Sequence, residues 1–237
     1  MDINIENLGF SYKKDIIFNH LNTSLHFDRD CIVLMGHNGA GKTTLFNLIC
    51  GILMPHSGKI SISKPNEIAY LPFDSNLYCN LSVMANIKFW YQIYNNKPLN
   101  INDSDFNELI NCLNLRKILN KKCIHLSSGE EKKVSFLIII LSHSQLMILD
   151  EPFNGIDPIS TIEIINLINS LRQKGFNFLI SSHQLDILEE LATQYIVMKD
   201  HKIIEKDYKD NINNESFYKK YKKIYGDEEN ENMVEYI

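Results

Sequence analysis

GHNGAGKTT, residues 36–44, carries the strongest indication of the fold in this sequence. It matches the pattern G-x-x-x-x-G-K-[ST], and the apolar run CIVLM at residues 31–35 stands directly before it. Leu45, Leu48 and Ile49 follow on one face of a predicted helix, so the pattern lies between a buried strand and a helix. In that context, successive backbone N–H groups and the helix N-terminus can surround a phosphate. The candidate phosphate-binding residues are therefore Gly36, His37, Asn38, Gly39, Ala40, Gly41, Lys42, Thr43 and Thr44.

Two acidic residues end a second buried strand further along the chain. The run LMILDEP at residues 146–152 places Asp150 and Glu151 at the carboxyl end of that strand, where ligands bind in open α/β sheets. Adjacent acids at a strand end are often a solvated turn, but the upstream phosphate loop favours a nucleotide site. We expect Lys42 to reach the β- and γ-phosphates, and Thr43 and Asp150 to hold Mg²⁺. Glu151 is predicted to orient or deprotonate an attacking water.

A histidine follows a third predicted strand, in the run FLISSHQ at residues 178–184. A single histidine at a strand end is more often structural. Here three strand ends are expected to meet at one edge of the sheet, which favours a role for His183 at the γ-phosphate. Glu151 and His183 are therefore the candidate catalytic residues.

The rest of the chain alternates predicted strands and helices. Further strands are predicted at residues 176–180 and 195–198, and further helices after Asp157-Pro158 and at about residues 184–192. This order indicates a doubly wound α/β fold. Residues 75–144 break the rhythm and are predicted to form an inserted, mainly helical lobe. The first 30 residues are predicted to form a small antiparallel sheet, and residues 206–237 a C-terminal helix with a flexible acidic end.

Composition limits the classes of function. The 237 residues, 44% of them hydrophobic, suffice for one large domain with an inserted lobe. The net charge of -5 argues against a nucleic-acid-binding surface. Five cysteines without a C-x-x-C pair predict reduced, buried thiols in a cytosolic protein. The sequence shows neither a signal peptide nor an apolar run near the roughly 20 residues that span a bilayer, so any membrane part is expected on another chain.

The run LSSGE, residues 126–130, is the most specific motif. Ser127 with Glu130 forms a capping-box pattern, which by itself predicts only the start of a helix. The run also resembles the LSGGQ signature of ATP-binding cassette (ABC) transporter nucleotide-binding subunits, with Ser128 in place of the first glycine and Glu130 in place of glutamine. The resemblance covers about residues 3–205 and is to exporter-type cassettes. It implies a P-loop NTPase (RecA-like) core with a small antiparallel β subdomain and an inserted helical subdomain, together an ABC ATPase domain at residues 1–205.

The same resemblance assigns roles to further residues. Tyr12 matches the aromatic residue that stacks on adenine, although a core aromatic is the alternative. His183 matches the switch histidine, and Asp157 matches the D-loop aspartate. The signature residues of this family contact ATP bound to the opposite subunit, which implies a homodimer or heterodimer of ATPase subunits. In this sequence the signature residues are Ser127, Ser128, Gly129 and Glu130.

Phe73 departs from the family pattern. After a run such as Tyr70-Leu71-Pro72 the family has glutamine, sometimes glutamate, whose side chain touches Mg²⁺ in a loop, the Q-loop, that faces the membrane partner. Phe73 has no lone-pair oxygen, so either water takes its place or the loop is retuned for coupling. We predict that Phe73 packs against the membrane partner or against the helical lobe.

These features together predict a subunit that dimerises on MgATP, hydrolyses ATP and powers export by a separately encoded transmembrane permease subunit. It would lie peripherally at the cytoplasmic face of the cell membrane and would not bind nucleic acid. Import remains an alternative direction. A soluble ABC-type ATPase of a cytosolic assembly machine is a second alternative. DNA-repair or translation ABC proteins are a third, but these usually carry two cassettes or a long coiled-coil insertion.

Overall fold

The computed structural model describes residues 1–74, 76–211 and 216–234, and this part of the chain contains two β-sheets. The larger sheet has the strand order β5-β6-β7-β3-β8-β9. Its strands run parallel from β5 to β8, and β9 is antiparallel to β8. The strands are β3 (Cys31–Met35), β5 (Ile68–Leu71), β6 (Leu146–Asp150), β7 (Asn177–Ser181), β8 (Gln194–Lys199) and β9 (Lys202–Tyr208).

The central strands of this sheet are covered on both faces. Every residue of β3, β6 and β7 is buried, which is why these strands read as continuous apolar runs rather than as alternating ones. Side chains of a strand alternate between its two faces. In β3, Val33 accordingly packs in one buried cluster, while Ile32 and Leu34 pack in the other.

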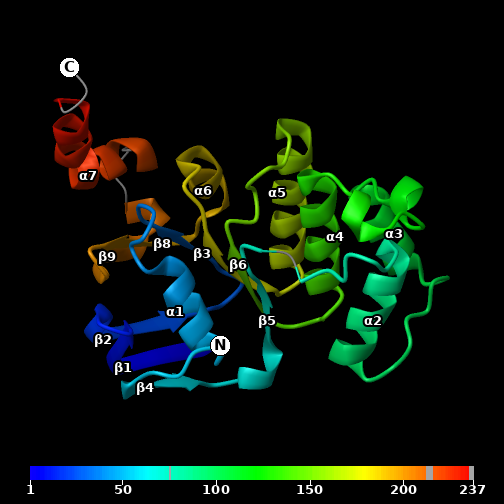
Figure 1. Ribbon diagram of the computed structural model, residues 1–237, viewed down its shortest axis with the longest axis horizontal. Helices are drawn as coiled ribbons and strands as arrows, with labels where there is room; N and C mark the ends of the chain where they lie inside the picture. Colours follow the sequence, from blue (N-terminus) through cyan, green and yellow to red (C-terminus); the bar gives the residue numbers. More distant parts are fainter. Residues whose placement is uncertain (75, 212–215, 235–237) are drawn as a thin grey trace.

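Different layers cover the two faces (Figure 1). The cluster on one face is completed by α1 (Lys42–Ile49) and by the antiparallel sheet β2-β1-β4. The cluster on the other face is completed by α4 (Ser128–Ile140), α5 (Pro158–Gln173) and α6 (Leu185–Leu191). The small sheet consists of β1 (Asp2–Tyr12), β2 (Asp15–His26) and β4 (Ser57–Ile62). The predicted fold class is confirmed, although β4, β5 and β9 were not predicted as strands.

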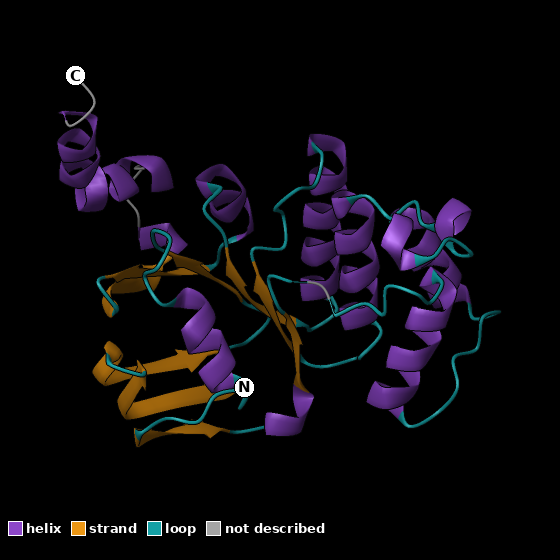
Figure 2. Ribbon diagram, in the orientation of Figure 1, coloured by secondary structure: helices purple, strands orange, loops and turns teal. Residues whose placement is uncertain are grey.

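The helical lobe lies at one end of the large sheet (Figure 2). Its helices are α2 (Val83–Asn95) and α3 (Ser104–Cys112), together with α4. Ser82 and Asp103 begin the first two of these helices, each accepting a hydrogen bond from a backbone N–H of the first turn. Short 3-10 turns complete the connections at η1 (Pro65–Glu67), η2 (Arg116–Ile118), η3 (Cys123–His125) and η4 (Lys209–Asn211).

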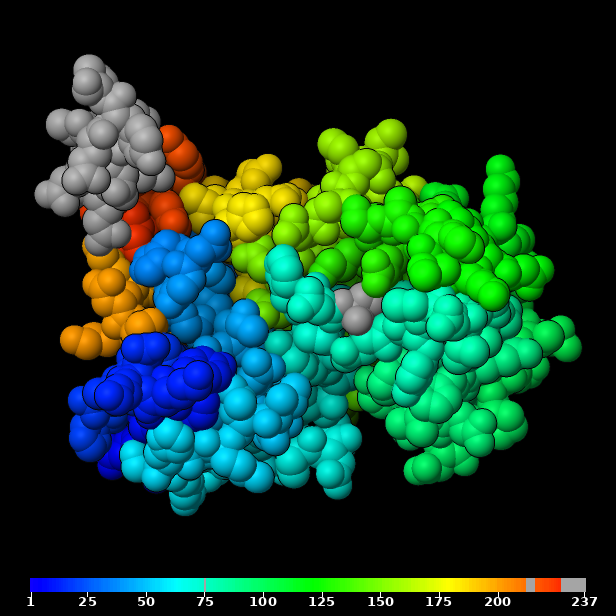
Figure 3. All heavy atoms as spheres, in the orientation of Figure 1, coloured from blue at the N-terminus to red at the C-terminus, as the bar shows by residue number. Residues whose placement is uncertain are grey.

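The C-terminal helix α7 (Phe217–Val234) begins at the opposite end of the molecule from the lobe (Figure 3). Strand β9 spans the domain boundary that the sequence suggested between residues 205 and 206, and that boundary stays a prediction. The backbone of the acidic end is helical as far as Val234. Its predicted flexibility stays untested, and residues 235–237 lie outside the described part of the chain.

Two sequence-based expectations about cysteine and the membrane can be compared with the structure. All five cysteines are free thiols. Cys31 and Cys123 are buried, but Cys79 and Cys112 are exposed, so the prediction of burial was wrong for these two. Among the described residues, none of the helices combines the length and the apolar character needed to cross a lipid bilayer.

Candidate nucleotide site at the edge of the sheet

The phosphate loop connects the end of β3 to the start of α1. Gly41 caps the helix with φ = 101°, a left-handed conformation that glycine adopts without the clash a side chain would cause. Gly36 is needed for a different reason, because a Cβ there would lie 2.7 Å from the carbonyl oxygen of Met198 on β8. The two glycines let the loop turn tightly while β8 packs against its base.

Lys42 is buried in this loop. Its ammonium donates to the carbonyl oxygens of Gly36, at 2.7 Å, and His37, at 3.1 Å. Burial lowers the pKa of Lys42, and the carboxylates of Glu151 and Asp150 partly oppose that effect. An anion entering the loop would offset the cost of burying the ammonium, as expected of a phosphate site.

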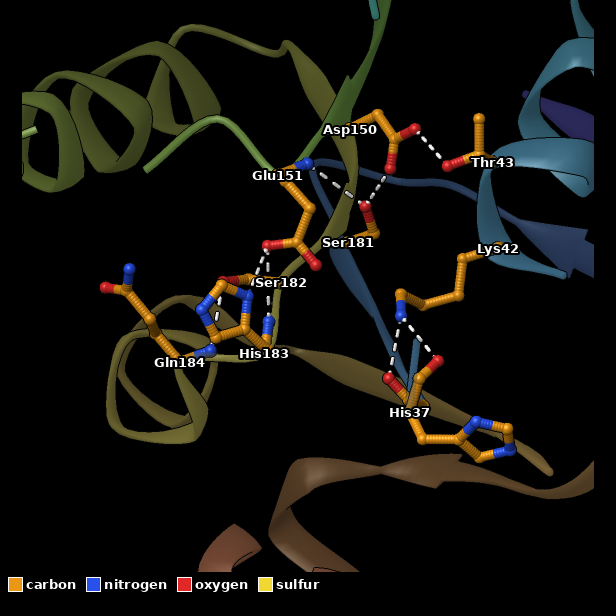
Figure 4. Close-up of polar contacts among 10 residues, drawn as sticks. His37, Lys42, Thr43, Asp150, Glu151, Ser181, Ser182, His183 and Gln184 are labelled. Carbon is orange, nitrogen blue, oxygen red and sulfur yellow. Dashed lines mark hydrogen bonds and ion pairs between the residues drawn. The ribbon is translucent and has the colours of Figure 1, made fainter. Parts of the chain in front are cut away.

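Asp150 is almost fully buried at the end of β6 and is fixed by two hydroxyl groups (Figure 4). Thr43 Oγ1, on α1, donates to Asp150 Oδ2 at 2.6 Å, and Ser181 Oγ, at the end of β7, donates to Asp150 Oδ1. Three elements therefore meet at one carboxylate. Ser181 was not among the predicted site residues, and its only signal in the sequence was its position two residues before His183.

Glu151 meets His183 directly. The backbone N–H of Glu151 donates to Ser181 Oγ at 3.1 Å. Glu151 Oε2 accepts from the backbone N–H of His183 at 3.3 Å and lies 3.0 Å from His183 Nδ1. The φ of Glu151 is 49°, a left-handed conformation that costs a non-glycine residue on the order of 1–3 kcal/mol.

A cavity of about 380 Å³ lies above these groups. Tyr12 at its rim is 44% exposed, and its hydroxyl lies 3.5 Å from Thr44 Oγ1, so the alternative of a core aromatic does not hold. Gly36, His37, Ala40 and His183 are not among the described residues that line the cavity. The lining consists of Tyr12, Ile17, Asn38, Gly39, Gly41, Lys42, Thr43, Thr44, Phe73, Asp150 and Glu151.

The signature stretch lies outside this cavity. The capping box is present, because Ser127 Oγ accepts from the N–H of Glu130 at 3.2 Å while Glu130 Oε2 accepts from the N–H of Ser127 at 2.9 Å. Ser128 Oγ donates to the carbonyl oxygen of Gly155 at 3.2 Å, and a Cβ on Gly129 would lie 3.4 Å from that same oxygen. The first turn of α4 thus packs against the loop that follows Glu151, and none of its four signature residues lines the cavity.

Asp157 caps α5. Its Oδ1 accepts from the backbone N–H of Ser160 at 3.0 Å, and hydrogen bonds from Ser160 hold the pKa of Asp157 below its usual value. This is the helix start that the sequence predicted, while a role for Asp157 in the D-loop stays a prediction.

Phe73 lies between the cavity and the helical lobe. Its side chain is 46% exposed and lines the cavity. The ammonium of Lys132, on α4, donates to the carbonyl oxygen of Phe73 and lies 5.2 Å from the centroid of its ring. Of the two partners expected for Phe73, the structure supplies a contact with the helical lobe. Lys132 was not a predicted site residue, because nothing in the sequence indicated that this charge points toward Phe73.

A family model described as "ABC transporter" matches residues 19–154, more than half of the chain. The chain belongs to the ABC transporter family. Its fold is the ATP-binding cassette: a solved chain described as "Structure of ATP binding subunit of ABC transporter" superposes with a TM-score of 0.81 at 22% identity, covering 93% of this chain and 98% of that one.

Two curated relatives of this ABC ATP-binding protein align over most of their length. The lantibiotic transport ATP-binding protein SrtF of Streptococcus pyogenes is 31% identical over 224 residues, which are 91% of this chain and 95% of the relative. The lipopolysaccharide export system ATP-binding protein LptB of Escherichia coli (strain K12) is 29% identical over 211 residues, 84% of this chain and 87% of LptB. The family model and these relatives together identify the chain as an ATP-binding protein of the ABC transporter family.

Proposed function

We propose that this subunit binds MgATP, dimerises around it, hydrolyses it and thereby powers export through a separate membrane-spanning chain. The observation that carries the proposal is the polar edge of the large sheet, where Thr43, Asp150, Glu151 and His183 converge beside a buried Lys42. The names of SrtF and LptB, one a transport and the other an export protein, support the direction.

Each group at this edge has a place in one reaction. Lys42, freed from the loop carbonyl oxygens, pairs with the β- and γ-phosphates. Glu151 orients a water molecule and accepts its proton as the water oxygen bonds to the γ-phosphorus. The bond from that phosphorus to the bridging oxygen breaks, and the electron pair of this bond leaves with ADP. The products are therefore ADP and inorganic phosphate. His183 contacts the Glu151 carboxylate, and although it does not line the cavity itself, we propose that it acts at the γ-phosphate.

The donor set fits a magnesium ion. Thr43 and Asp150 supply a hydroxyl and a carboxylate, and Mg²⁺ is usually held by one or two such oxygens together with substrate phosphates and water. Bound there, the ion would neutralise charge on the phosphate oxygens.

The exposed first turn of α4 supports the dimer. Ser127 and Ser128 are exposed, and a helix N-terminus attracts anions through its free N–H groups. Because these residues do not line the cavity of their own chain, we propose that they complete the cavity of a second subunit. Whether that subunit is a second copy or a related chain is decided by mixing experiments described in the Discussion.

An apolar surface on the helical lobe supports the membrane partner. Tyr78 and Phe89 are 48% and 38% exposed and meet edge to face at 5.0 Å, and Trp90 stacks between Tyr78 and Tyr94. Exposed aromatic clusters of this kind mark protein interaction sites. We propose that a transmembrane permease subunit docks here, which would place this subunit peripherally at the cytoplasmic face of the membrane. Recovery of the chain in a soluble complex without a membrane protein would instead support the assembly-machine alternative.

The central test is hydrolysis by the purified chain. Phosphate release should require both ATP and Mg²⁺. Glu151→Gln keeps the shape of the side chain and removes its basic oxygen, so turnover should fall by about 10²–10⁴-fold while ATP binding survives. Glu67→Gln, the same change at an exposed ion pair with Lys64, is the control and should leave turnover unchanged. Wild-type turnover in Glu151→Gln would remove Glu151 from the role of base.

A further inference from the structure

Lys132 connects the helical lobe to the nucleotide cavity. It lies on α4, the helix that Ser127 begins. Its ammonium donates to the carbonyl oxygen of Phe73 and faces the ring of the same residue at 5.2 Å. Phe73 lines the cavity together with Lys42 and Glu151. One ammonium on the helical lobe thus contacts a residue that lines the cavity.

Within the described part of the chain, four carboxylates act on this ammonium. Asp150 and Glu151 act on it from the end of β6, Asp74 from the segment that follows Phe73, and Glu131 from its own helix. Burial lowers the pKa of Lys132 more than these four carboxylates raise it. The ammonium is therefore held in a poorly solvated position, where a nearby change in charge is weakly screened.

We infer that Lys132 is the positioning residue through which the helical lobe senses an occupied nucleotide cavity, in place of the polar side chain that Phe73 lacks. The inference rests on the proposed function, because it requires a polyphosphate to enter the cavity. The negative charge of that polyphosphate arrives on the side of Asp150 and Glu151 and attracts the ammonium. The ring of Phe73 excludes water from the ammonium and holds it by a cation–π contact.

The helix carries this response to the signature residues. Lys132 and Ser127 belong to one continuous α4, whose later turns are buried against the core. A displacement of Lys132 toward the cavity therefore moves the exposed first turn of the helix with it. Lys133, the next residue, differs in that it pairs with Glu163 of α5 at 3.3 Å. It provides a control of the same chemistry on the same helix.

The single tryptophan of the sequence gives a direct readout. Trp90 lies on α2 of the lobe and lines a small pocket with Leu71 and Pro72, which lead into Phe73. Its fluorescence should change when the lobe moves relative to this segment. We would titrate full-length Glu151→Gln protein with MgATP, following Trp90 fluorescence and measuring the Kd for ATP by calorimetry on the same samples.

In the Glu151→Gln background, adding Lys132→Met should reduce the fluorescence change at least about fivefold while the Kd for ATP stays within about threefold, since the phosphate loop is intact. Lys132→Arg should restore the change, because the guanidinium keeps the charge and the cation–π contact. Lys133→Met should behave as the parent. Lys132→Gln provides a second variant if Lys132→Met does not fold.

Measurements of turnover distinguish a sensing role of Lys132 from a purely structural role. With Glu151 restored, Lys132→Met should lower kcat about tenfold with little change in KM, the pattern of a group that acts after ATP binds. Lys132→Arg should recover most of that loss. The inference would be overturned if Lys132→Met showed a full fluorescence change and a normal kcat, or if Lys132→Met and Lys133→Met showed equal losses. Either result would leave the proposed function standing. A parent that binds ATP without any fluorescence change would also overturn it. A parent that binds no ATP would overturn the proposed function and this inference with it.

Discussion

The sheet edge and the first turn of α4 both gather polar groups, but they hold them in different ways. At the sheet edge, Asp150 and Glu151 are buried, and their partners come from α1, β7 and the segment after β7. At α4, Ser127 and Glu130 satisfy each other within four residues, and Ser127 is exposed. The edge is organised by tertiary structure, whereas the turn is a local motif presented to the surroundings.

This difference indicates how far one chain can complete the site. Buried groups with partners from several elements are already positioned for chemistry. An exposed helix N-terminus has free N–H groups but needs a second surface to use them. We therefore expect substitutions at the sheet edge to act within one chain, and substitutions at the turn to act across two.

The largest effect is expected from blocking the turn of α4. Ser127→Arg places a bulky cation at the surface that the second subunit would meet. Hydrolysis should fall on the order of 10²-fold or more, and ATP-driven dimerisation should be lost in light scattering. Binding of ATP by the single subunit should remain nearly intact, because Ser127 lies outside the cavity of its own chain. Loss of that binding would instead indicate misfolding or a role within one chain.

Mixing two inactive variants sharpens the test. In a mixed dimer of Ser127→Arg and Lys42→Ala, one composite site carries both substitutions and the other carries neither. Equimolar mixing should therefore restore part of the activity, provided that the mixed dimer forms. If each variant is inactive alone and the mixture is too, while both still bind to a common partner, the chain works in a heterodimer with a different ATPase subunit.

A second prediction compares two aspartates near the cavity. Asp150→Ala removes a carboxylate that lines the cavity and leaves the hydroxyls of Thr43 and Ser181 without their acceptor. Magnesium-dependent hydrolysis should fall about 10–100-fold or more. Asp74→Ala should change it by less than about threefold, since the described lining includes Phe73 but not Asp74. The measurement is phosphate release against Mg²⁺ concentration. If Asp74→Ala alone abolished the Mg²⁺-dependent hydrolysis, this loop would be shown to supply a ligand to the ion.

The sequence indicated the residues of the sheet edge because each of them stands directly after an apolar run that predicts a buried strand. Apolar runs ending in Gly36, Asp150 and the segment before His183 were enough to place three strand ends together. Ser181 could not be predicted, because a serine at a strand end carries no pattern of its own. Lys132 could not be predicted either, since its contact with Phe73 joins residues 59 positions apart. Strand β9 was missed because its half-exposed residues lack a continuous apolar run.

A third prediction concerns Phe73, which joins the two regions. Restoring a polar side chain with Phe73→Gln adds an oxygen at the cavity while leaving the backbone carbonyl available to Lys132. ATPase activity of the isolated subunit should stay within about tenfold of the parent or rise. Transport by the complete complex should fall, because Phe73 contacts Lys132 of the helical lobe, on which the membrane partner is proposed to dock. The measurements are the ATPase activity with and without the partner and the transport by the complete complex. Unimpaired transport would show that this position tolerates substitution.

The smallest effect is expected at Glu130, where the local motif can be tested by pH. Hydrogen bonds from Lys121 and from the N–H of Ser127 hold the pKa of Glu130 below its ordinary value. A carboxylate with a lowered pKa in the folded state contributes stability that is present above its unfolded pKa, near 4.3, and is lost as the pH falls through its folded value.

Glu130→Gln keeps the capping geometry but removes the charge that pairs with Lys121 at 2.7 Å. Because the pair is partly exposed, the Tm of the Glu130→Gln protein should lie no more than about 3 °C below that of the parent at pH 7. That difference from the parent should shrink as the pH is lowered below about 4.3, which thermal unfolding followed by circular dichroism at several pH values would show. A difference that is independent of pH would mean that the charge of Glu130 does not stabilise the turn, and that the capping box holds it by hydrogen bonding alone.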